Sequence, residues 1–188
     1  MLRPLLRQPL HCSVSPRTVG IRSYHSTRYA PPPPPHNRAE ASILAAALLH
    51  VPTHGFTTTS LTHGARDTGY LDISPTIFPR GAFDLVQYHL DTQRRALETS
   101  VALTPDMSIP RKIRALCVAR LRGNEPVIGR LGEALAIMSL MENIPASTKE
   151  LGALSDEMWG IAGDKSVDTS WYTKRAMLAG VYASTGMG

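Results

Sequence analysis

Residues 43–61 read ILAAALLHVPTHGFTTTSL. The stretch decides the fold because strong helix formers lead into a turn and then into a second helix start. Pro52 is expected to stop the first helix, which we place at residues 39–49, and Gly55 can take the positive φ that a tight turn requires. The Thr-rich segment 57–66 predicts a second short helix. We therefore expect two helices joined by a tight turn.

The rest of the chain continues this helical pattern. Further helices are expected at residues 81–103, 109–122, 127–141, 147–162 and 169–182. Ser147 and Glu150 have the spacing of a capping box, and Asp168 is expected to cap the last helix. No segment shows persuasive strand alternation. The sequence therefore predicts an all-α domain of short and medium helices.

The positive charge is concentrated at the N-terminus. The chain has a formal charge of +5, but six arginines and no acidic residue precede Glu40, so residues 39–188 carry a formal charge of −1. An Arg- and Ser-rich leader without a continuous apolar run is typical of a mitochondrial transit peptide; the alternative is a disordered basic tail that binds nucleic acid. Five prolines at residues 31–35 predict a stiff spacer. We assign residues 1–37 to the transit peptide and spacer.

No recognisable catalytic or metal-binding motif is present in the sequence. The motifs HExxH, CxxC, GxSxG and GxxxxGK[ST] are absent. His50 and His54 have i, i+4 spacing, but Pro52 is expected to break the helix that would align them. Cys117 is the only cysteine outside the leader, so no disulfide is expected. We assign no catalytic residue, metal ligand or cofactor, and the chain is not expected to be an enzyme.

Two sets of motifs resemble known proteins. The opening stretch, followed by TIFPRGAFDLV at residues 76–86, is similar to the N-terminal helix-turn-helix of TetR-type regulators. More specifically, MENIPAS (141–147), SDEMWGIAGDKSVD (155–168) and SWYTKRAMLAGVY (170–182) resemble the mitochondrial ubiquinone (coenzyme Q) biosynthesis accessory protein family, the ninth member of the coenzyme Q assembly. The resemblance spans about residues 38–185 and suits a fungal member.

The resemblance implies a fold and a function. It implies one TetR-like domain, with a helix-turn-helix-like segment at 38–80 and ligand-binding helices at 81–185. Family members bind a polyprenylated quinone intermediate, as well as phospholipid. They present the intermediate to the di-iron demethoxyubiquinone hydroxylase of the coenzyme Q biosynthetic complex, at the matrix side of the mitochondrial inner membrane. The contact with that membrane is peripheral. A TetR-like interaction module that binds a protein partner without lipid cargo is the alternative.

DNA binding is not expected, although a helix-turn-helix suggests it first. A DNA-reading helix needs cations, because phosphate contacts supply much of the affinity. The segment LDISPTIF at 71–78 contains no Lys or Arg, and Asp67 and Asp72 lie beside or within it. We therefore interpret the motif as scaffold.

The resemblance and the side-chain chemistry together give candidate binding sites. A lipid pocket is expected between helix 127–141, whose Met side chains are flexible and suit adaptable apolar pockets, and the last helix. Ordinary core packing is the alternative for these methionines. The candidate lipid-binding residues are Met138, Met141, Trp159 and Arg175, the last of which matches a phospholipid head-group contact of the family. The candidate partner-binding residues, carried over from the family's surface patch, are Met158, Asp168, Trp171 and Tyr172.

Trp171 and Tyr172 are adjacent at the start of the last helix, so their side chains point about 100° apart. Tyr172 shares its stripe with small residues and is expected to pack inward. Trp171 shares its stripe with the charged Arg175, which a core would accept only at a cost, so this stripe is expected to be a docking surface. In the alternative, Trp171 covers the core and Arg175 stacks over its ring.

The family continues beyond residue 185 with two more helices, one of them amphipathic and assigned to membrane contact. TetR-like proteins also form homodimers through C-terminal helices. The sequence therefore predicts a C-terminally truncated form with apolar area exposed on the last helix. Dimer formation and full enclosure of the lipid remain open for such a form.

Overall fold

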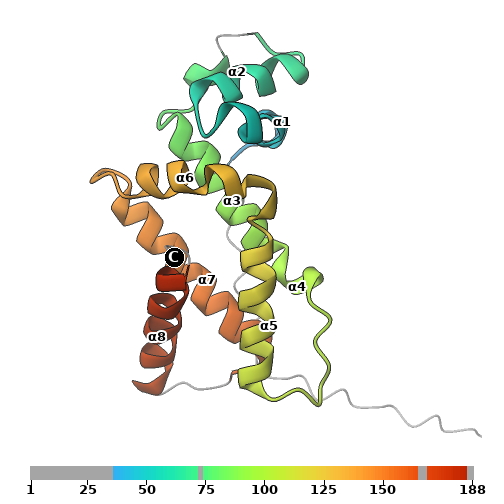
Figure 1. Cartoon of the computed structure of the whole chain (residues 1–188), viewed down its shortest axis with the longest axis vertical. Helices are drawn as coiled ribbons and strands as arrows, with labels where there is room; N and C mark the ends of the chain where they lie inside the picture. Colours follow the sequence, from blue (N-terminus) through green and yellow to red (C-terminus); the bar gives the residue numbers. More distant parts are fainter. Residues whose placement is uncertain (1–35, 72–73, 165–168, 186–188) are drawn as a thin grey trace, which may run out of the picture. The chain divides into compact units, whose positions relative to one another are not determined.

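The computed structural model describes residues 36–71, 74–164 and 169–185, and all regular secondary structure in these ranges is helical. The α-helices, and the 3₁₀ helices marked η, are α1 (Arg38–His54), α2 (Thr58–Asp67), η1 (Ser74–Ile77), α3 (Ala82–Arg95), α4 (Leu97–Ser100), α5 (Ile109–Arg122), η2 (Glu125–Arg130), α6 (Leu131–Met138), α7 (Ile144–Ala162) and α8 (Thr169–Thr185) (Figure 1). The predicted all-α class is confirmed. The predicted transit peptide lies almost entirely outside the described residues.

Helix α1 starts at a capping box and continues past its expected end. The Asn37 side chain accepts a hydrogen bond from the Glu40 amide at 3.0 Å, and the Glu40 carboxylate accepts one from the Asn37 amide at 3.0 Å. The prediction that Pro52 stops the helix is wrong, because Pro52 lies inside the last turn. Its missing N–H removes one intrahelical hydrogen bond, the one that the Leu48 carbonyl would accept. Val51 beside it is fully buried and accepts a hydrogen bond from the Gly55 amide at 2.8 Å.

Helices α1 and α2 pack closely because residue 64 is glycine. A Cβ atom at Gly64 would lie 2.5 Å from the Ala47 backbone nitrogen and 2.6 Å from the Ile43 carbonyl oxygen. The close approach buries Leu44 and Leu61 completely. The predicted pair of helices joined by a tight turn is confirmed.

Two of the longer predicted helices are interrupted. The segment 81–103 forms α3 and the short α4, and the segment 127–141 forms the end of η2 and then α6. The predicted stop at Gly163 is confirmed, since Gly163 has φ 86° and ψ 27° and ends α7 in the left-handed conformation.

The predicted capping box at the start of α7 does not form. Helix α7 begins earlier, with a proline in its first turn. The Ser147 hydroxyl donates instead to the Met138 carbonyl at 3.3 Å, and Glu150 accepts from the Arg94 guanidinium at 2.6 Å. Tertiary partners therefore take both side chains away from the local motif.

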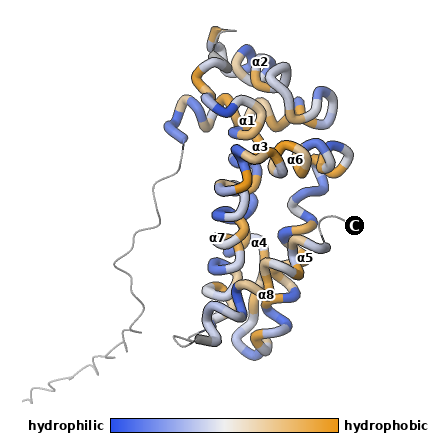
Figure 2. Tube along the Cα trace, turned by 90° about the vertical axis from the view of Figure 1, so that its left-hand side faces the viewer, coloured by the Kyte–Doolittle hydropathy of each residue, from blue (hydrophilic) through white to orange (hydrophobic). Residues whose placement is uncertain are grey.

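The buried apolar side chains form two clusters. The first joins α1, α2, α3, η2 and α6, and the second joins α4, α5 and α7, with side chains of α8 packed against it. Helix α3 contacts α1, α2, α6 and α7, while α7 packs against both α5 and α8 (Figure 1). Figure 2 shows that α6 is hydrophobic along most of its length. The contact between α3 and α7 therefore joins the two clusters.

Candidate functional site

A cavity of about 380 Å³ lies between α3, the α5–η2–α6 segment, α7 and α8. Its volume falls within the range of ligand pockets, which is roughly 300–1,000 Å³. The wall is mostly apolar and consists of Phe56, Val86, His89, Leu90, Leu121, Asn124, Ile128, Leu131, Ala134, Leu135, Met138, Ser147, Thr148, Leu151, Tyr182, Ala183 and Thr185.

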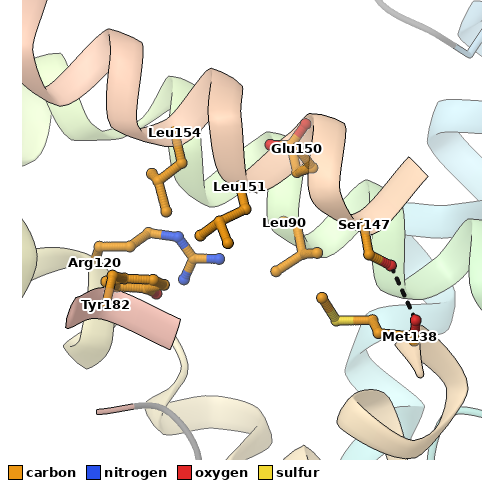
Figure 3. Close-up of a pocket in the computed structure, with 8 residues that line it drawn as sticks. All are labelled: Leu90, Arg120, Met138, Ser147, Glu150, Leu151, Leu154 and Tyr182. Carbon is orange, nitrogen blue, oxygen red and sulfur yellow. Dashed lines mark hydrogen bonds between the residues drawn. The ribbon is translucent and has the colours of Figure 1, made fainter. Parts of the chain in front are cut away.

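A smaller cavity of about 60 Å³ adjoins the first (Figure 3). The two cavities share the wall residues Leu90, Met138, Ser147, Leu151 and Tyr182. The smaller one adds Arg120, Glu150 and Leu154. Together they form one apolar space with charged groups on one side.

The cavity lies where the two core clusters meet. Val86 and Ala134 in its wall belong to the first cluster, whereas Leu154 belongs to the second and Tyr182 packs against it. Neither cluster fills the space between them. A gap at the junction of two packed cores therefore creates the site.

Hydrogen bonds from the turn after α1 to α6 and its preceding residue position Phe56 in the cavity wall. Its backbone N–H donates to Glu133 Oε2 at 3.1 Å, and Arg130 Nη1 donates to Glu133 Oε1 at 2.8 Å. Arg130 Nη2 also donates to the Thr53 carbonyl at 3.0 Å. Gly55, with φ 71°, makes room for the carboxylate, since a Cβ there would lie 2.1 Å from Glu133 Oε2. The turn after α1 is thereby fixed to α6.

Four polar side chains form one side of the apolar space. Arg120 is 2% exposed, and its Nη1 donates to Asn124 Oδ1 at 2.7 Å. His89 Nε2 lies 3.1 Å from the same oxygen, and the Tyr182 hydroxyl is hydrogen-bonded to Asn124. Burial lowers the pKa of His89, and the positive charge of Arg120 lowers it further, while the hydrogen bond to Asn124 opposes the shift. His89 is therefore neutral at physiological pH and donates through Nε2.

The carboxylate of Glu150, in the wall of the smaller cavity, belongs to an ionic network. Arg94 donates to Glu150 at 2.6 Å, to Glu157 at 2.6 Å and to Asp91 at 2.5 Å. Burial raises the pKa of Glu150, although the hydrogen bond and charge of Arg94 act in the opposite direction. The network links α3 to α7 beside the cavity.

The structure brings only one of the predicted lipid-binding residues to the cavity. Met138 lines both cavities (Figure 3). Met141 is 88% exposed, because α6 ends at Met138 and the following turn leads away from the cavity. Trp159 and Arg175 are not wall residues of either cavity. A cavity thus lies beside α6 as expected, with Met138 in its wall and the other three candidates outside it, while lipid binding at any of the four stays a prediction.

Trp159 and Arg175 instead join α7 to α8. The Trp159 Nε1–H donates to the Lys174 carbonyl at 3.3 Å, and the Lys174 ammonium lies 5.5 Å from the centre of the Trp159 ring. Arg175 donates to Asp156 at 2.6 Å and lies 3.8 Å from Asp164. Its charge is therefore already paired with two carboxylates, which argues against the predicted head-group contact.

The predicted partner-binding residues do not form one surface. Met158 is 1% exposed and packs in the second core cluster, with its sulfur 3.9 Å from Cys117 Sγ, so it is not a surface contact. Asp168, including its predicted capping role, lies outside the described residues. Trp171 and Tyr172 begin α8 and contact each other edge to face, with ring centres 4.7 Å apart.

The predicted orientation of this aromatic pair is wrong. Tyr172 is 71% exposed, whereas Trp171 is partly buried and carries the Arg175 guanidinium 3.9 Å above its ring. The ion pair between Arg175 and Asp156 lets a charged residue lie on the packed side of the helix. Our argument from the charge of Arg175 failed because it did not anticipate this partner. The alternative, in which Arg175 stacks over Trp171, describes the structure.

The histidines of α1 and α2 also differ from expectation. Because α1 continues through Pro52, His50 and His54 are aligned, and both rings lie near His63. His50 Nε2 contacts Asp67 Oδ2 at 2.6 Å. Even so, within the described ranges no group of three such side chains has the geometry to hold a metal ion. The same part of the chain contains no helix that is long and apolar enough to cross a membrane.

Sequence reasoning did not identify the polar wall of the cavity. The best sequence signal for this wall was Arg120. It follows the fully buried Leu116 by four residues and so lies on the apolar stripe of α5. His89, Asn124 and Tyr182 come from three other segments, and no local pattern connects them. A charged residue within an apolar stripe was the only clue.

The described residues thus form an all-α protein with a ligand-sized apolar cavity between its helices, in agreement with a TetR-like fold. A family profile described as COQ9 matches residues 144–187. The chain is 36% identical over 183 residues to the "Ubiquinone biosynthesis protein coq9, mitochondrial" of Schizosaccharomyces pombe, and the match covers 94% of this chain and 71% of that protein. It is 37% identical over 153 residues to the human "Ubiquinone biosynthesis protein COQ9, mitochondrial", covering 76% of this chain and 48% of the relative.

A Xenopus laevis relative, "Ubiquinone biosynthesis protein COQ9-B, mitochondrial", is also 37% identical over 153 residues, and 52% of its length is covered. The chain therefore belongs to the COQ9 family. It spans most of the yeast relative and about half of the two vertebrate ones.

Proposed function

We propose that this chain is a non-catalytic lipid-binding accessory protein of ubiquinone biosynthesis, which binds a polyprenylated quinone intermediate and presents it to the di-iron demethoxyubiquinone hydroxylase. Two findings support the proposal. The chain belongs to a family whose members are named for ubiquinone biosynthesis, and it contains an apolar cavity of about 380 Å³. The cavity is the observation that carries the proposal.

The composition of the wall favours an elongated apolar ligand. Most of the wall is aliphatic, and Met138 adds a side chain that adapts to different shapes. Ile128, Thr148 and Thr185 in the wall are exposed, so the cavity reaches the protein surface there. A polyprenyl chain longer than the cavity can leave through this rim. Burial of apolar ligand surface against the wall would supply the affinity.

We further propose that the protein acts in mitochondria, on the matrix side of the inner membrane and in peripheral contact with it. The acid-free leader at residues 1–37 and the mitochondrial names of the relatives support this location. A carrier of an insoluble quinone must also exchange its ligand with a membrane. Because segment 71–78, which includes the short η1 helix, contains no Lys or Arg, we expect no specific DNA binding.

Native mass spectrometry of the purified 188-residue chain tests the lipid proposal. We expect isoprenoid or phospholipid to remain bound to the wild-type protein. The substitution Leu135→Trp places a larger ring in the cavity wall and should reduce the bound lipid by more than half. Leu140→Trp is the matched control, because Leu140 is 51% exposed and does not line the cavity. Equal lipid on all three proteins would overturn the proposal.

A protein-interaction module without lipid cargo is the second candidate function. The observation that favours it is the outer face of α8, where Tyr172, Met177 and Val181 are 71%, 67% and 61% exposed. Exposed apolar faces often bind partners. In a pull-down with the hydroxylase, Tyr172→Ala should weaken binding under either proposal. If Leu135→Trp binds the hydroxylase normally and the wild-type protein carries no lipid, only the interaction module without lipid cargo is supported.

A further inference from the structure

Arg120 is a buried cation at the inner side of the apolar space. It is 2% exposed, and its Nε atom is buried without a hydrogen-bond partner. A guanidinium has five N–H donors, and the structure gives Arg120 one hydrogen bond, from Nη1 to Asn124 at 2.7 Å. Leaving such donors unpaired in a protein interior is costly. Arg120 therefore has hydrogen-bonding capacity that the protein itself does not use.

The charge of Arg120 is not neutralised by direct contact. Among the described residues, no carboxylate pairs with it within 4.0 Å. The negative charge of Glu150 acts on it from across the smaller cavity, but that carboxylate is bonded to Arg94 at 2.6 Å. A ligand oxygen in the cavity could therefore accept hydrogen bonds from Arg120, because few acceptors of the protein compete for these donors.

The groups around Arg120 strengthen this preference for oxygen. Asn124 Oδ1 already accepts from Arg120 and lies 3.1 Å from His89 Nε2, so the strongest local acceptor is occupied. The Tyr182 hydroxyl, bonded to Asn124, lies in the walls of both cavities. This side of the space is therefore rich in donors and poor in free acceptors.

The guanidinium is aimed into the apolar space. Figure 3 shows it beside the ring of Tyr182, pointing toward the side where Leu90 and Met138 lie. The exposed rim residues Ile128 and Thr148 belong only to the larger cavity. The space thus has a polar inner side and an exposed rim.

We propose that Arg120, together with Tyr182, binds the ring oxygens of the quinone or phenol head group, while the apolar chain of the ligand runs toward the rim at Ile128. This assignment rests on the proposed function and adds the residue that recognises the head group. A guanidinium N–H donating to a ring oxygen forms a charge-assisted hydrogen bond, which is stronger than a neutral one. The buried charge would then distinguish an oxygenated ring from a plain hydrocarbon.

Calorimetric titration of the full chain with three ligands tests the assignment: decylubiquinone, decylbenzene and decyl phosphate. The decisive variant is Arg120→Met, which keeps a flexible, unbranched apolar side chain and removes the guanidinium with its donors. Replacing a buried charge by an apolar group is often tolerated by the fold. Arg122→Met is the matched control, because Arg122 lies on the same helix, is exposed and does not line the cavity.

We expect Arg120→Met to raise the Kd for decylubiquinone by about tenfold or more, as for the loss of a hydrogen bond to a charged group. The Kd of Arg120→Met for decylbenzene should stay within about twofold of the wild-type value, because this ligand has no oxygen atom that could lose a hydrogen bond. Arg122→Met should change neither Kd. An equal loss of affinity for decylubiquinone and decylbenzene, or no loss of affinity for either, would overturn the assignment. A loss for decyl phosphate alone would assign the site to a phosphate head group and would equally overturn it.

The outcomes separate this assignment from the proposed function. If the wild-type chain binds both decylubiquinone and decylbenzene but Arg120→Met has no effect, only the assignment fails. If the wild-type chain binds none of the three ligands, the proposed function fails with it. Should Arg120→Met fail to fold, Tyr182→Phe removes only a hydroxyl and must still weaken decylubiquinone selectively; an unchanged Kd would reject the proposal.

Discussion

The aromatic pair at the start of α8 gives the sharpest test of the structure, because its two rings differ in exposure. Trp171 is partly buried beneath the Arg175 guanidinium, which lies 3.9 Å from its ring centre. Tyr172, the next residue, is 71% exposed. We compare Trp171→Ala with Tyr172→Ala. The first should destabilise the protein clearly more than the second.

The magnitudes follow from the buried areas. A Trp side chain has roughly 200 Å² of surface, of which the partly buried Trp171 removes about 130–180 Å² from water, worth about 3–4.5 kcal/mol at ~25 cal/mol/Å². Loss of the stacked Arg175 adds about 0.5–1 kcal/mol. For Tyr172, the 29% of the surface that is covered corresponds to about 60 Å², or at most about 1.5 kcal/mol. We therefore expect Trp171→Ala to be less stable than Tyr172→Ala by at least about 2 kcal/mol.

Urea unfolding of both variants, followed by far-UV circular dichroism, measures this difference directly. A parallel pull-down with the hydroxylase gives the second readout. Tyr172→Ala should weaken that contact while it leaves most of the stability intact. If Tyr172→Ala lowers the free energy of unfolding as much as Trp171→Ala, the orientation of α8 described here is wrong. The docking role of its outer face would be wrong with it.

Two further predictions concern the helix packing and the cavity wall. Gly64→Ala should lower the free energy of unfolding by about 2 kcal/mol or more, since its Cβ would meet the α1 backbone. The control Gly160→Ala, with no atom near its Cβ, should be neutral or slightly stabilising. Equal effects of the two substitutions in urea unfolding would contradict the close packing of α1 and α2. Because burial lowers the pKa of His89, the unfolded chain binds a proton there more readily, so stability should fall as pH drops below about 6.5. The raised pKa of Glu150 acts in the opposite direction, so the His89 contribution is read from the difference between wild type and His89→Gln in urea unfolding at pH 7.5 and 5.5. An identical pH dependence of the two proteins would refute a neutral, buried His89.

Most of the fold could be predicted because its signals are local. Apolar periodicity located α2 and α5 within about a residue, and Gly163 ended α7 as expected. The errors have tertiary causes. Pro52 remains helical because burial of Val51 outweighs one missing hydrogen bond, and Glu150 leaves its capping box because Arg94 competes for it. Local rules could not anticipate either partner.

The candidate site was less predictable because it is assembled from distant segments. The helix expected to line a pocket was identified from its composition, and its Met138 lies in the cavity wall. Met141 is only three residues further along the chain, yet it is 88% exposed because α6 ends between them. Arg175 was assigned to a lipid head group from its match to the family, but its pairing with Asp156 could be seen only in three dimensions.

The cavity exists because the two core clusters do not merge. Helix α3 takes part in the first cluster through Val86 and also lines the cavity through Leu90. If the space had only been a packing defect, aliphatic side chains would be its expected lining, since a dry void is most easily tolerated when its wall is apolar. Instead, α5 places the guanidinium of Arg120 there, with one of its donors unpaired. A buried charge beside an apolar cavity costs stability in the empty protein, and under the proposed head-group assignment an oxygen-bearing ligand would offset that cost by pairing with it. The assignment therefore predicts that Arg120, which weakens the free protein, makes its stability depend on the ligand.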